Sequence, residues 1–252
     1  MSFKAYTERV RTRLHMTRHN SAPAGLVFDL RGGVFELDGL SFEIPRDLTT
    51  RGFRAQFFFN TYERKERVLL EKYLPAESTV LELGACLGIV AGVTSRLLDD
   101  PSRHLVVEAD PRLVPLLEAN RDRNSLPFGI ENRLVTRSDD GTFFVSSVIL
   151  SGSSTAGPES IGRIDVPTTT VEELEAAHGM RFDALVMDIE GGELQFMREN
   201  PALLRQLNFV SVEFHESIIL SAGIAECEQL MASAGLVHAE TVAECAVWLR
   251  AN

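Results

Sequence analysis

Glutamates and glycines stand where two short apolar runs end, and their spacing indicates a ligand-binding turn. Glu82, Gly84 and Gly88 follow the spacing ExGxxxG at the end of the apolar run 79–83. This run predicts a buried strand, and the two glycines open the apolar helix that follows. Glycines let the backbone approach a ligand closely, and the first amides of a helix face that ligand. The segment therefore predicts a cofactor site.

The acid at the strand end indicates which cofactor binds. The Glu82 carboxylate repels phosphate groups and pairs with a cationic amine, which favours S-adenosylmethionine, a molecule with an amine and a sulfonium but no phosphate. The GxGxxG of dinucleotide sites does not follow the strand, and the chain has no GxxxxGK segment followed by Ser or Thr. The alternative is that the two glycines merely pack a helix closely on a sheet.

A second acid follows the next apolar run. His104–Val107 predicts another buried strand, and Glu108 comes about twenty residues after the glycine turn, where ribose-binding acids stand in nucleotide folds. A carboxylate there can accept hydrogen bonds from both ribose hydroxyls. The alternative for Glu108 is a solvated strand end. Asp110 and Pro111 then predict the start of a helix, with Asp110 as its cap.

The final third of the chain carries the residues that could act on an acceptor. Predicted strands end at Asp188 and at His215, and alternate strand residues would place Glu213 and His215 on one face. Histidine is the natural base for a hydroxyl at neutral pH. The acids Asp188, Glu190 and Glu213 could orient it, serve as the base themselves, or hold a divalent cation. Alternatively, Glu193 is only an acid favoured in the first turn of a helix, and His215 only a core histidine.

Composition excludes several classes of protein. The formal net charge is −11 over 252 residues, which argues against a binder of nucleic-acid backbones. Cys86, Cys227 and Cys245 form no CxxC pattern, so neither a disulfide framework nor a zinc site is expected, and a reducing cytoplasm is the expected location. We found no apolar run long enough to span a bilayer and no signal-peptide core, so stable membrane insertion is not expected.

Residues 1–60 predict an N-terminal extension ahead of a core domain at 61–252. Phe3, Tyr6, Val10 and Leu14 share one face of a basic amphipathic helix. This helix is expected to dock on its own domain or on a second subunit of a homodimer. A membrane surface and a cover for the active site are the alternatives. Val34–Ile44 alternates around Asp38 and Gly39, which predicts a β-hairpin.

The core elements are predicted as alternating strands and helices. A helix is expected over Tyr62–Tyr73, with Val68, Leu69 and Leu70 facing inward. Further strands are expected over Glu131–Val135 and Thr142–Val148, and the Gly/Ser-rich segment 151–162 predicts a surface loop that is either a lid or a connector. The last elements are a helix over Ala225–Ala234 and two strands, Gly235–His238 and Cys245–Leu249, that close the sheet as an antiparallel hairpin.

Together the motifs resemble the FkbM family of S-adenosylmethionine-dependent methyltransferases. The resemblance runs from Tyr62 to His215 and is most specific in Met187-Asp-Ile-Glu-Gly-Gly-Glu193, which follows the threonine-rich Val166-Pro-Thr-Thr-Thr170. It implies the α/β fold of class I methyltransferases, a Rossmann-like, mostly parallel seven-stranded sheet with an antiparallel last strand and helices on both faces. It also implies methylation of hydroxyls on sugars, glycolipids or natural products.

Carried over position by position, the resemblance implies two groups of site residues. Around the cofactor it implies Tyr62, Glu82, Gly84, Ala85, Cys86, Gly88, Glu108, Ala109, Asp110, Ser138, Asp139 and Asp188. On the acceptor side it implies Asp188, Glu190, Glu193, Glu213 and His215. The family commonly has Asp at position 82 and Asn at position 86, whereas this chain has Glu82 and Cys86.

The sequence therefore predicts a methyltransferase that acts on a hydroxyl of a small molecule, with S-adenosylmethionine as cofactor and a divalent metal as an open alternative at the acid cluster. An NAD-dependent dehydrogenase would use the same fold and Glu108, but this chain lacks the GxGxxG motif of such enzymes after its first core strand. A protein that binds the cofactor without catalysing a reaction is the third alternative. The identity of the acceptor is not encoded in any motif that we can read.

Overall fold

The computed structural model describes residues 21–146 and 160–251. The chain separates into two compact units, Met1–Arg64 and Lys65–Asn252, and the boundary lies four residues beyond the predicted one. The predicted N-terminal helix lies outside the described residues, and so do residues 147–159 of the Gly/Ser-rich segment. Among the described helices, none is long and apolar enough to cross a membrane.

The first unit contains two helices and the predicted hairpin. Its helices are α2 (Ala22–Leu30) and α3 (Arg51–Phe58), and its strands are β1 (Val34–Leu37) and β2 (Leu40–Glu43). The strands pair antiparallel about a turn in which Asp38 and Gly39 both have positive φ, as a two-residue hairpin turn requires. The hairpin prediction is confirmed.

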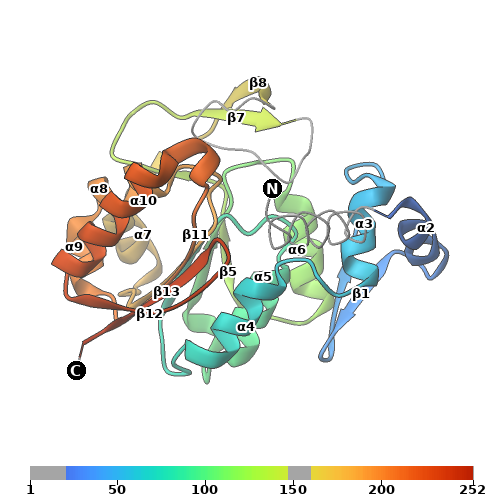
Figure 1. Ribbon diagram of the computed structural model, residues 1–252, viewed down its shortest axis with the longest axis horizontal. Helices are drawn as coiled ribbons and strands as arrows, with labels where there is room; N and C mark the ends of the chain where they lie inside the picture. Colours follow the sequence, from blue (N-terminus) through green and yellow to red (C-terminus); the bar gives the residue numbers. More distant parts are fainter. Residues whose placement is uncertain (1–20, 147–159, 252) are drawn as a thin grey trace, which may run out of the picture. The chain divides into compact units, whose positions relative to one another are not determined.

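A seven-stranded sheet forms the centre of the second unit (Figure 1). The strands, in spatial order, are β12 (Leu236–Val242), β13 (Cys245–Arg250), β11 (Phe209–Glu213), β10 (Ala184–Met187), β3 (Val80–Leu83), β4 (His104–Val107) and β5 (Gly129–Glu131). The five strands from β11 to β5 are parallel, and β13 is antiparallel to both β11 and β12. The predicted fold class is confirmed, including the closing hairpin.

Helices cover both faces of this sheet. One apolar cluster packs α7 (Val171–His178), α8 (Glu193–Glu199), α9 (Pro201–Gln206) and α10 (Glu216–Ser233) against one face. Further clusters join α4 (Arg64–Tyr73), α5 (Ile89–Leu97) and α6 (Val114–Arg123) to side chains of the other face. A short 3-10 helix, Pro101–Arg103, precedes β4. Because both faces are covered, the parallel strands are apolar almost throughout.

The chain order reverses between β3 and β10. From β3 the sheet continues through β4 to β5 on one side, and through β10 to β11 on the other. In open α/β sheets, ligands bind outside the carboxyl ends of the strands at such a reversal. The glycine turn after β3 and the acidic segment after β10 both lie at this place.

Four predictions about single elements are wrong in detail. Val68 is 48% exposed, because α4 buries the face that carries Leu69 and Leu70. The strand predicted over Glu131–Val135 is two strands, β5 in the main sheet and β6 (Leu134–Val135), which pairs with β9 (Thr168–Thr169). The helix predicted over Ala225–Ala234 is the second half of α10. The helix predicted to begin at Asp110 is α6, which begins at Val114.

The segment between β5 and β10 contains a second hairpin. Here β7 (Thr142–Ser146) pairs antiparallel with β8 (Ser160–Asp165). Phe143 and Val145 of β7 pack with Val166 in a small cluster of their own. The end of the predicted loop, 160–162, therefore belongs to a strand.

We predict that Gly84→Ala destabilises the protein far more than Gly179→Ala. Both glycines have positive φ, but a Cβ at Gly84 would lie 1.8 Å from the backbone oxygen of Asp188, whereas one at Gly179 would meet nothing within 4 Å. Gly179→Ala should lower the free energy of unfolding by about 1 kcal/mol because of its φ alone. Gly84→Ala should lower it by at least about 3 kcal/mol. Urea unfolding followed by circular dichroism measures both. Equal losses would contradict this reading of the Gly84 contact.

Candidate active site

A cavity opens at the reversal point of the sheet. Its volume is about 380 Å³. It is bordered by the ends of β3, β4 and β10, by the start of α8 and by the segment that carries β6, β7 and β8. Its lining includes, from the predicted site, Gly84, Cys86, Glu108, Ala109, Asp110, Ser138, Asp188 and Glu190. Eight of the predicted residues are thus brought to one cavity.

Glu108 lies at the end of β4 with its carboxylate held by the backbone. One oxygen accepts from the N–H of Cys86 and the other from the N–H of Asp110, each at 2.8 Å. The side chain is only 5% exposed. Burial raises the pKa of the Glu108 carboxyl to about 7, against the opposing effect of the two backbone hydrogen bonds. Each oxygen keeps a second lone pair, which fits a pair of ribose hydroxyls at the cavity wall.

The glycine turn connects β3 to this cavity. The Gly84 N–H donates to the carbonyl of Val107 at 3.0 Å, so the turn is fixed to the end of β4. Cys86 lines the cavity with a φ of 50°, which a cysteine rarely adopts. Gly88 caps α5, and a Cβ there would lie 2.6 Å from Leu117 of α6. Gly88 therefore serves the packing of the turn, and it is not among the cavity-lining residues.

Ala85 and Tyr62 each pack among apolar side chains. Ala85 is buried in an apolar cluster that includes Leu117, and it is not among the residues that line the cavity within the described ranges. Tyr62 belongs to the first unit, where its ring packs against Phe53 and Phe57.

Glu82 does not reach the cavity. Its carboxylate lies 3.2 Å from Nε2 of His104, and both side chains are almost completely buried. The Nδ1 atom of His104 lies 2.9 Å from the Ser95 hydroxyl, on α5. Leu81 and Leu83 point to one face of the sheet, so Glu82 between them points to the other. The structure thus places Glu82 beneath α5, outside the lining of the cavity.

The residues predicted around the cofactor at positions 110, 138 and 139 do not all line the cavity. Asp110 lines the cavity, but instead of capping a helix it accepts from the Arg112 backbone and pairs with its guanidinium at 2.6 Å. Ser138 lines the cavity as predicted, and its hydroxyl accepts from the N–H of Asp140. Asp140, rather than Asp139, is the acid in the lining.

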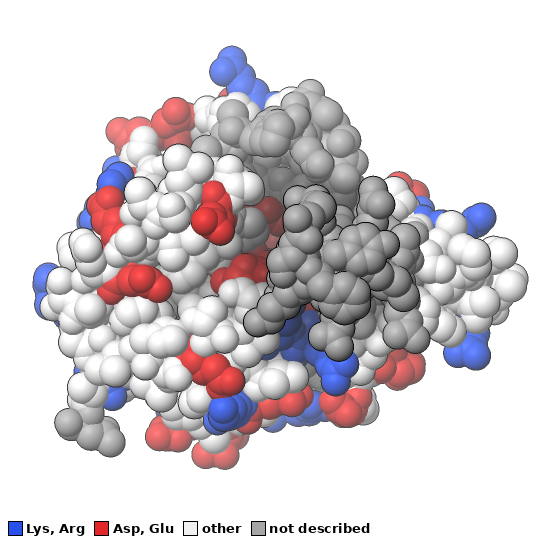
Figure 2. Space-filling view, in the orientation of Figure 1, with Lys and Arg blue, Asp and Glu red and all other residues white. Residues whose placement is uncertain are grey.

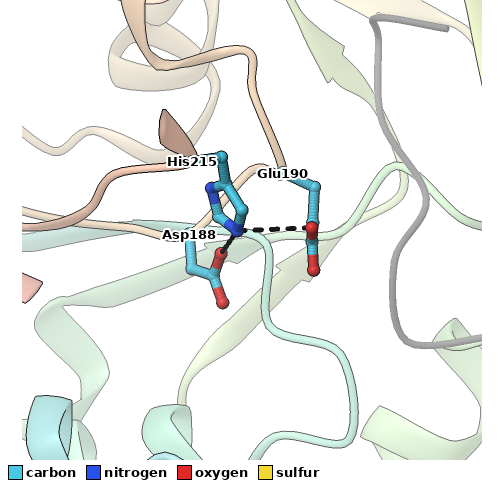
Figure 3. Close-up of side chains that lie close together, drawn as sticks. All are labelled: Asp188, Glu190 and His215. Carbon is cyan, nitrogen blue, oxygen red and sulfur yellow. Dashed lines mark ion pairs between the residues drawn. The ribbon is translucent and has the colours of Figure 1, made fainter. Parts of the chain in front are cut away.

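Asp188, Glu190 and His215 form a cluster at the carboxyl ends of β10 and β11 (Figure 3). Nε2 of His215 lies 3.6 Å from Oδ1 of Asp188 and 3.2 Å from Oε2 of Glu190. Both carboxylates line the cavity, whereas His215 stands behind them. The predicted reason for this placement is wrong, because β11 ends at Glu213 and His215 is the cap residue of α10.

Glu193 holds His215 from the other side. Its Oε1 lies 2.8 Å from Nδ1 of His215 and also accepts from the N–H of Gly191 at 2.9 Å. Burial alone would lower the pKa of His215, but the hydrogen bond to Glu193 and the charges of Asp188 and Glu190 outweigh it and raise the pKa to about 9. The raised pKa disfavours the neutral ring that a general base at position 215 requires.

Further acids border the same cluster. Carboxylate oxygens of Glu66, Asp188 and Glu213 lie within 4.8 Å of one another. Burial is the main cause that raises the pKa of Glu213, and the charge of Glu244 adds to it while His215 opposes it. Glu66 is 2% exposed and was not predicted, because an acid early in α4 resembles an ordinary first-turn acid.

Several lining residues were not found from the sequence. Four of them share one face of α8 and the turn before it, at the helical spacing that could have revealed them: Gly192, Gln195, Phe196 and Glu199. A second group comes from the segment between β5 and β10 and includes Arg133, Thr136, Asp140, Thr142, Phe143, Phe144 and Arg163. No motif marks this second group.

Acidic side chains outnumber basic ones around the cavity. The acidic lining residues are Glu108, Asp110, Asp140, Asp188, Glu190 and Glu199, and the basic ones are Arg133 and Arg163. Figure 2 shows acidic side chains at several places on the visible face, some of them recessed. A ligand with cationic character is favoured in this cavity over a polyanion.

Comparison with known proteins assigns the family. The methyltransferase FkbM domain matches residues 82–235, which is more than half of the chain. The chain belongs to the FkbM methyltransferase domain family. The resemblance seen in the sequence is thereby confirmed, and with it S-adenosylmethionine-dependent methyl transfer as the general activity. No curated protein is significantly similar to the chain in sequence.

Solved methyltransferase structures share the arrangement of elements at low identity. A putative O-methyltransferase from Klebsiella pneumoniae is 13% identical, with a TM-score of 0.45 over 73% of this chain and 79% of that one. An O-methyltransferase from Bacillus cereus in complex with SAH is 13% identical, with a TM-score of 0.44 over 73% and 78%. A precorrin-6y C5,15-methyltransferase from Geobacter metallireducens is 10% identical, with a TM-score of 0.46 over 83% and 93%. Sequence identities and TM-scores this low support no inference about the acceptor.

We predict that the affinity for S-adenosylhomocysteine rises with pH through about 7. The Glu108 carboxyl has its pKa raised to about 7, and only its ionised form can accept from both ribose hydroxyls. Binding then releases a proton, so affinity should increase about tenfold from pH 6 to pH 8. Isothermal titration calorimetry measures this, with Glu108→Gln as the control that should lose the dependence. A flat profile in the unmodified protein would contradict the Glu108 assignment.

We also predict that Cys86→Asn stabilises the protein. Asparagine tolerates the left-handed backbone region far better than cysteine does, and the φ of residue 86 is 50°. The free energy of unfolding should rise by up to about 1 kcal/mol in Cys86→Asn. It should fall by a similar amount in Cys86→Val, because valine is β-branched. Denaturant unfolding of the three proteins checks the order of stability, and a Val variant as stable as the Asn variant would refute it.

Proposed function

We propose that this methyltransferase acts on a hydroxyl group of a small molecule such as a sugar, a glycolipid or a natural product. The observation that supports this most is the position of Asp188 and Glu190. They line the same cavity as Glu108, and His215 stands directly behind them. A cofactor wall and a proton-handling cluster thus border one space.

The residues of the cavity fit the cofactor that the family uses. Glu108 would accept from the ribose hydroxyls, the backbone at Gly84 and Cys86 leaves room beside it, and Asp110 and Ser138 border the remaining space. When bound, S-adenosylmethionine supplies a methyl group activated by the positive charge of its sulfonium. The acidic lining favours such a cation.

Asp188 and Glu190 would orient the acceptor. A carboxylate on the cavity wall accepts a hydrogen bond from a hydroxyl, directs its oxygen and receives its proton as the oxygen forms a new bond. The ring of His215 faces both acids, and its raised pKa favours the cationic form, which reduces the repulsion between them. Holding the acceptor in place can supply several kcal/mol, up to about 7 to 11 at the best-oriented limit.

A small-molecule acceptor fits the charge of the chain better than nucleic acid does. The net charge is −11, and the cavity lining is mainly acidic, so a polyanionic substrate would be repelled.

Two further proposals are a cytoplasmic location and acceptor selection by the N-terminal extension. The dehydrogenase alternative is not supported by the family match. A protein that binds the cofactor without transferring methyl groups is the alternative that an activity test excludes.

Two variants should separate acceptor chemistry from cofactor binding. We predict that His215→Ala lowers kcat at least about 100-fold on a hydroxyl acceptor found by screening, with the affinity for S-adenosylhomocysteine changed less than about threefold. Glu108→Ala should weaken that affinity about 10-fold to 100-fold, through loss of charge-assisted hydrogen bonds. Steady-state kinetics and calorimetry measure the two effects.

His238→Ala is the matched control, because His238 is exposed and contacts only Thr241 and Trp248 among the described residues. It should leave both quantities unchanged. Full turnover by His215→Ala would remove the cluster from the mechanism. If the unmodified protein binds S-adenosylhomocysteine but methylates no hydroxyl in the screen, the proposed acceptor class is wrong.

A further inference from the structure

We propose that Asp188, Glu190 and His215 bind one divalent transition-metal ion at the wall of the cavity. The inference rests on the proposed function, because it assigns the ion to the cluster that orients the acceptor hydroxyl. It depends on the donor atoms and their spacing, which are described first.

The three donor atoms are spaced like neighbouring ligands of one ion. Nε2 of His215 lies 3.2 Å from Oε2 of Glu190 and 3.6 Å from Oδ1 of Asp188, and the cluster's donor atoms all lie within 4.8 Å of one another. Ligand bonds of about 2.1 Å put neighbouring donors about 3.0 Å apart in an octahedron and about 3.4 Å apart in a tetrahedron. An ion between these atoms therefore requires only small movements of the side chains.

Nε2 of His215 is directed between the two carboxylates. It lies 3.2 Å from Oε2 of Glu190 and 3.6 Å from Oδ1 of Asp188. Figure 3 shows the ring nitrogen facing both acids at once. A metal ion in this place would contact all three donors.

Glu193 prepares His215 for this role. Its carboxylate is fully buried and lies 2.8 Å from Nδ1 of His215, so Nδ1 is taken up by this contact and Nε2 is the ring nitrogen that can face an ion. The Gly191 N–H bonds to the same oxygen and fixes it. A carboxylate behind a metal-binding histidine is the arrangement that orients the ring and makes it a better ligand.

The donor set indicates the kind of ion. Imidazole nitrogen suits first-row transition metals, and carboxylates suit the harder members such as Mn²⁺ and Fe²⁺, so a mixed set disfavours Ca²⁺. Carboxylate oxygens of Glu66 and Glu213 lie within 4.8 Å of those of Asp188, so further oxygen atoms stand close to the cluster. Three protein ligands leave coordination positions open, and Asp188 and Glu190 line the cavity from which a hydroxyl would enter.

The ion would complete the acceptor side of the site. A hydroxyl in an open coordination position loses its proton more readily than a free one. In the reaction the sulfonium carbon–sulfur bond breaks and an oxygen–methyl bond forms, while the hydroxyl proton passes to a carboxylate of the cluster. The ion keeps its oxidation state, so no oxidant or reductant is needed.

Titration of the full-length, EDTA-treated protein with MnCl₂ tests the site directly. The electron paramagnetic resonance signal of free Mn²⁺ measures binding without any need for activity. We expect one saturable site per chain, with an affinity that Glu190→Gln and His215→Ala each lower at least 10-fold. Glu226→Gln, which removes an exposed acid paired with Arg198, should bind Mn²⁺ like the unmodified protein. Circular dichroism checks that each variant is folded.

The outcomes separate this inference from the proposed function. Absence of saturable Mn²⁺ binding, or binding that folded Glu190→Gln and His215→Ala proteins retain in full, overturns the metal site. If methyl transfer to a hydroxyl then continues unchanged in EDTA, the proposed function stands without a metal. Saturable binding that both variants lose supports the site, even if the protein methylates no hydroxyl and the proposed function fails.

Discussion

The close contact between Gly84 and the backbone of Asp188 determines the geometry of the site. The Asp188 carbonyl oxygen occupies the position that a Cβ of residue 84 would need. The Asp188 N–H donates to the Leu83 carbonyl, and the Gly84 N–H donates to that of Val107, each at 3.0 Å. The ends of β10, β3 and β4 are thereby joined side by side. Glu108 and Asp188 border one cavity because of this contact.

The carboxylates of the cavity are contacted by different kinds of groups, and these contacts suit them to different tasks. Glu108 is held by two backbone N–H groups, those of Cys86 and Asp110. Asp110 pairs with Arg112, which fixes it as part of the wall. Asp188 and Glu190 both face Nε2 of His215. Backbone donors leave Glu108 able to accept from a neutral hydroxyl.

Most of the helices and strands, and the residues at strand ends, could be predicted from the sequence. The direction of side chains within buried strands could not. Each residue of Val80–Leu83 is buried, so no alternation of polar and apolar residues shows which way Glu82 points. Its burial against His104 follows from the packing of α5, which the motif does not reveal. His215 was found by its type although the strand ends two residues earlier. Glu66 and the residues between β5 and β10 reach the site only through the tertiary fold.

A crystal structure of the protein with S-adenosylhomocysteine tests the central claim most directly. The claim is that one cavity joins the cofactor at Glu108 to the acceptor cluster at Asp188. The account predicts both ribose hydroxyls within hydrogen-bond distance of the Glu108 carboxylate and the cofactor sulfur facing Asp188 and Glu190 across open space. A nucleoside that makes no contact with Glu108, or a sulfur directed away from these two acids, would contradict it.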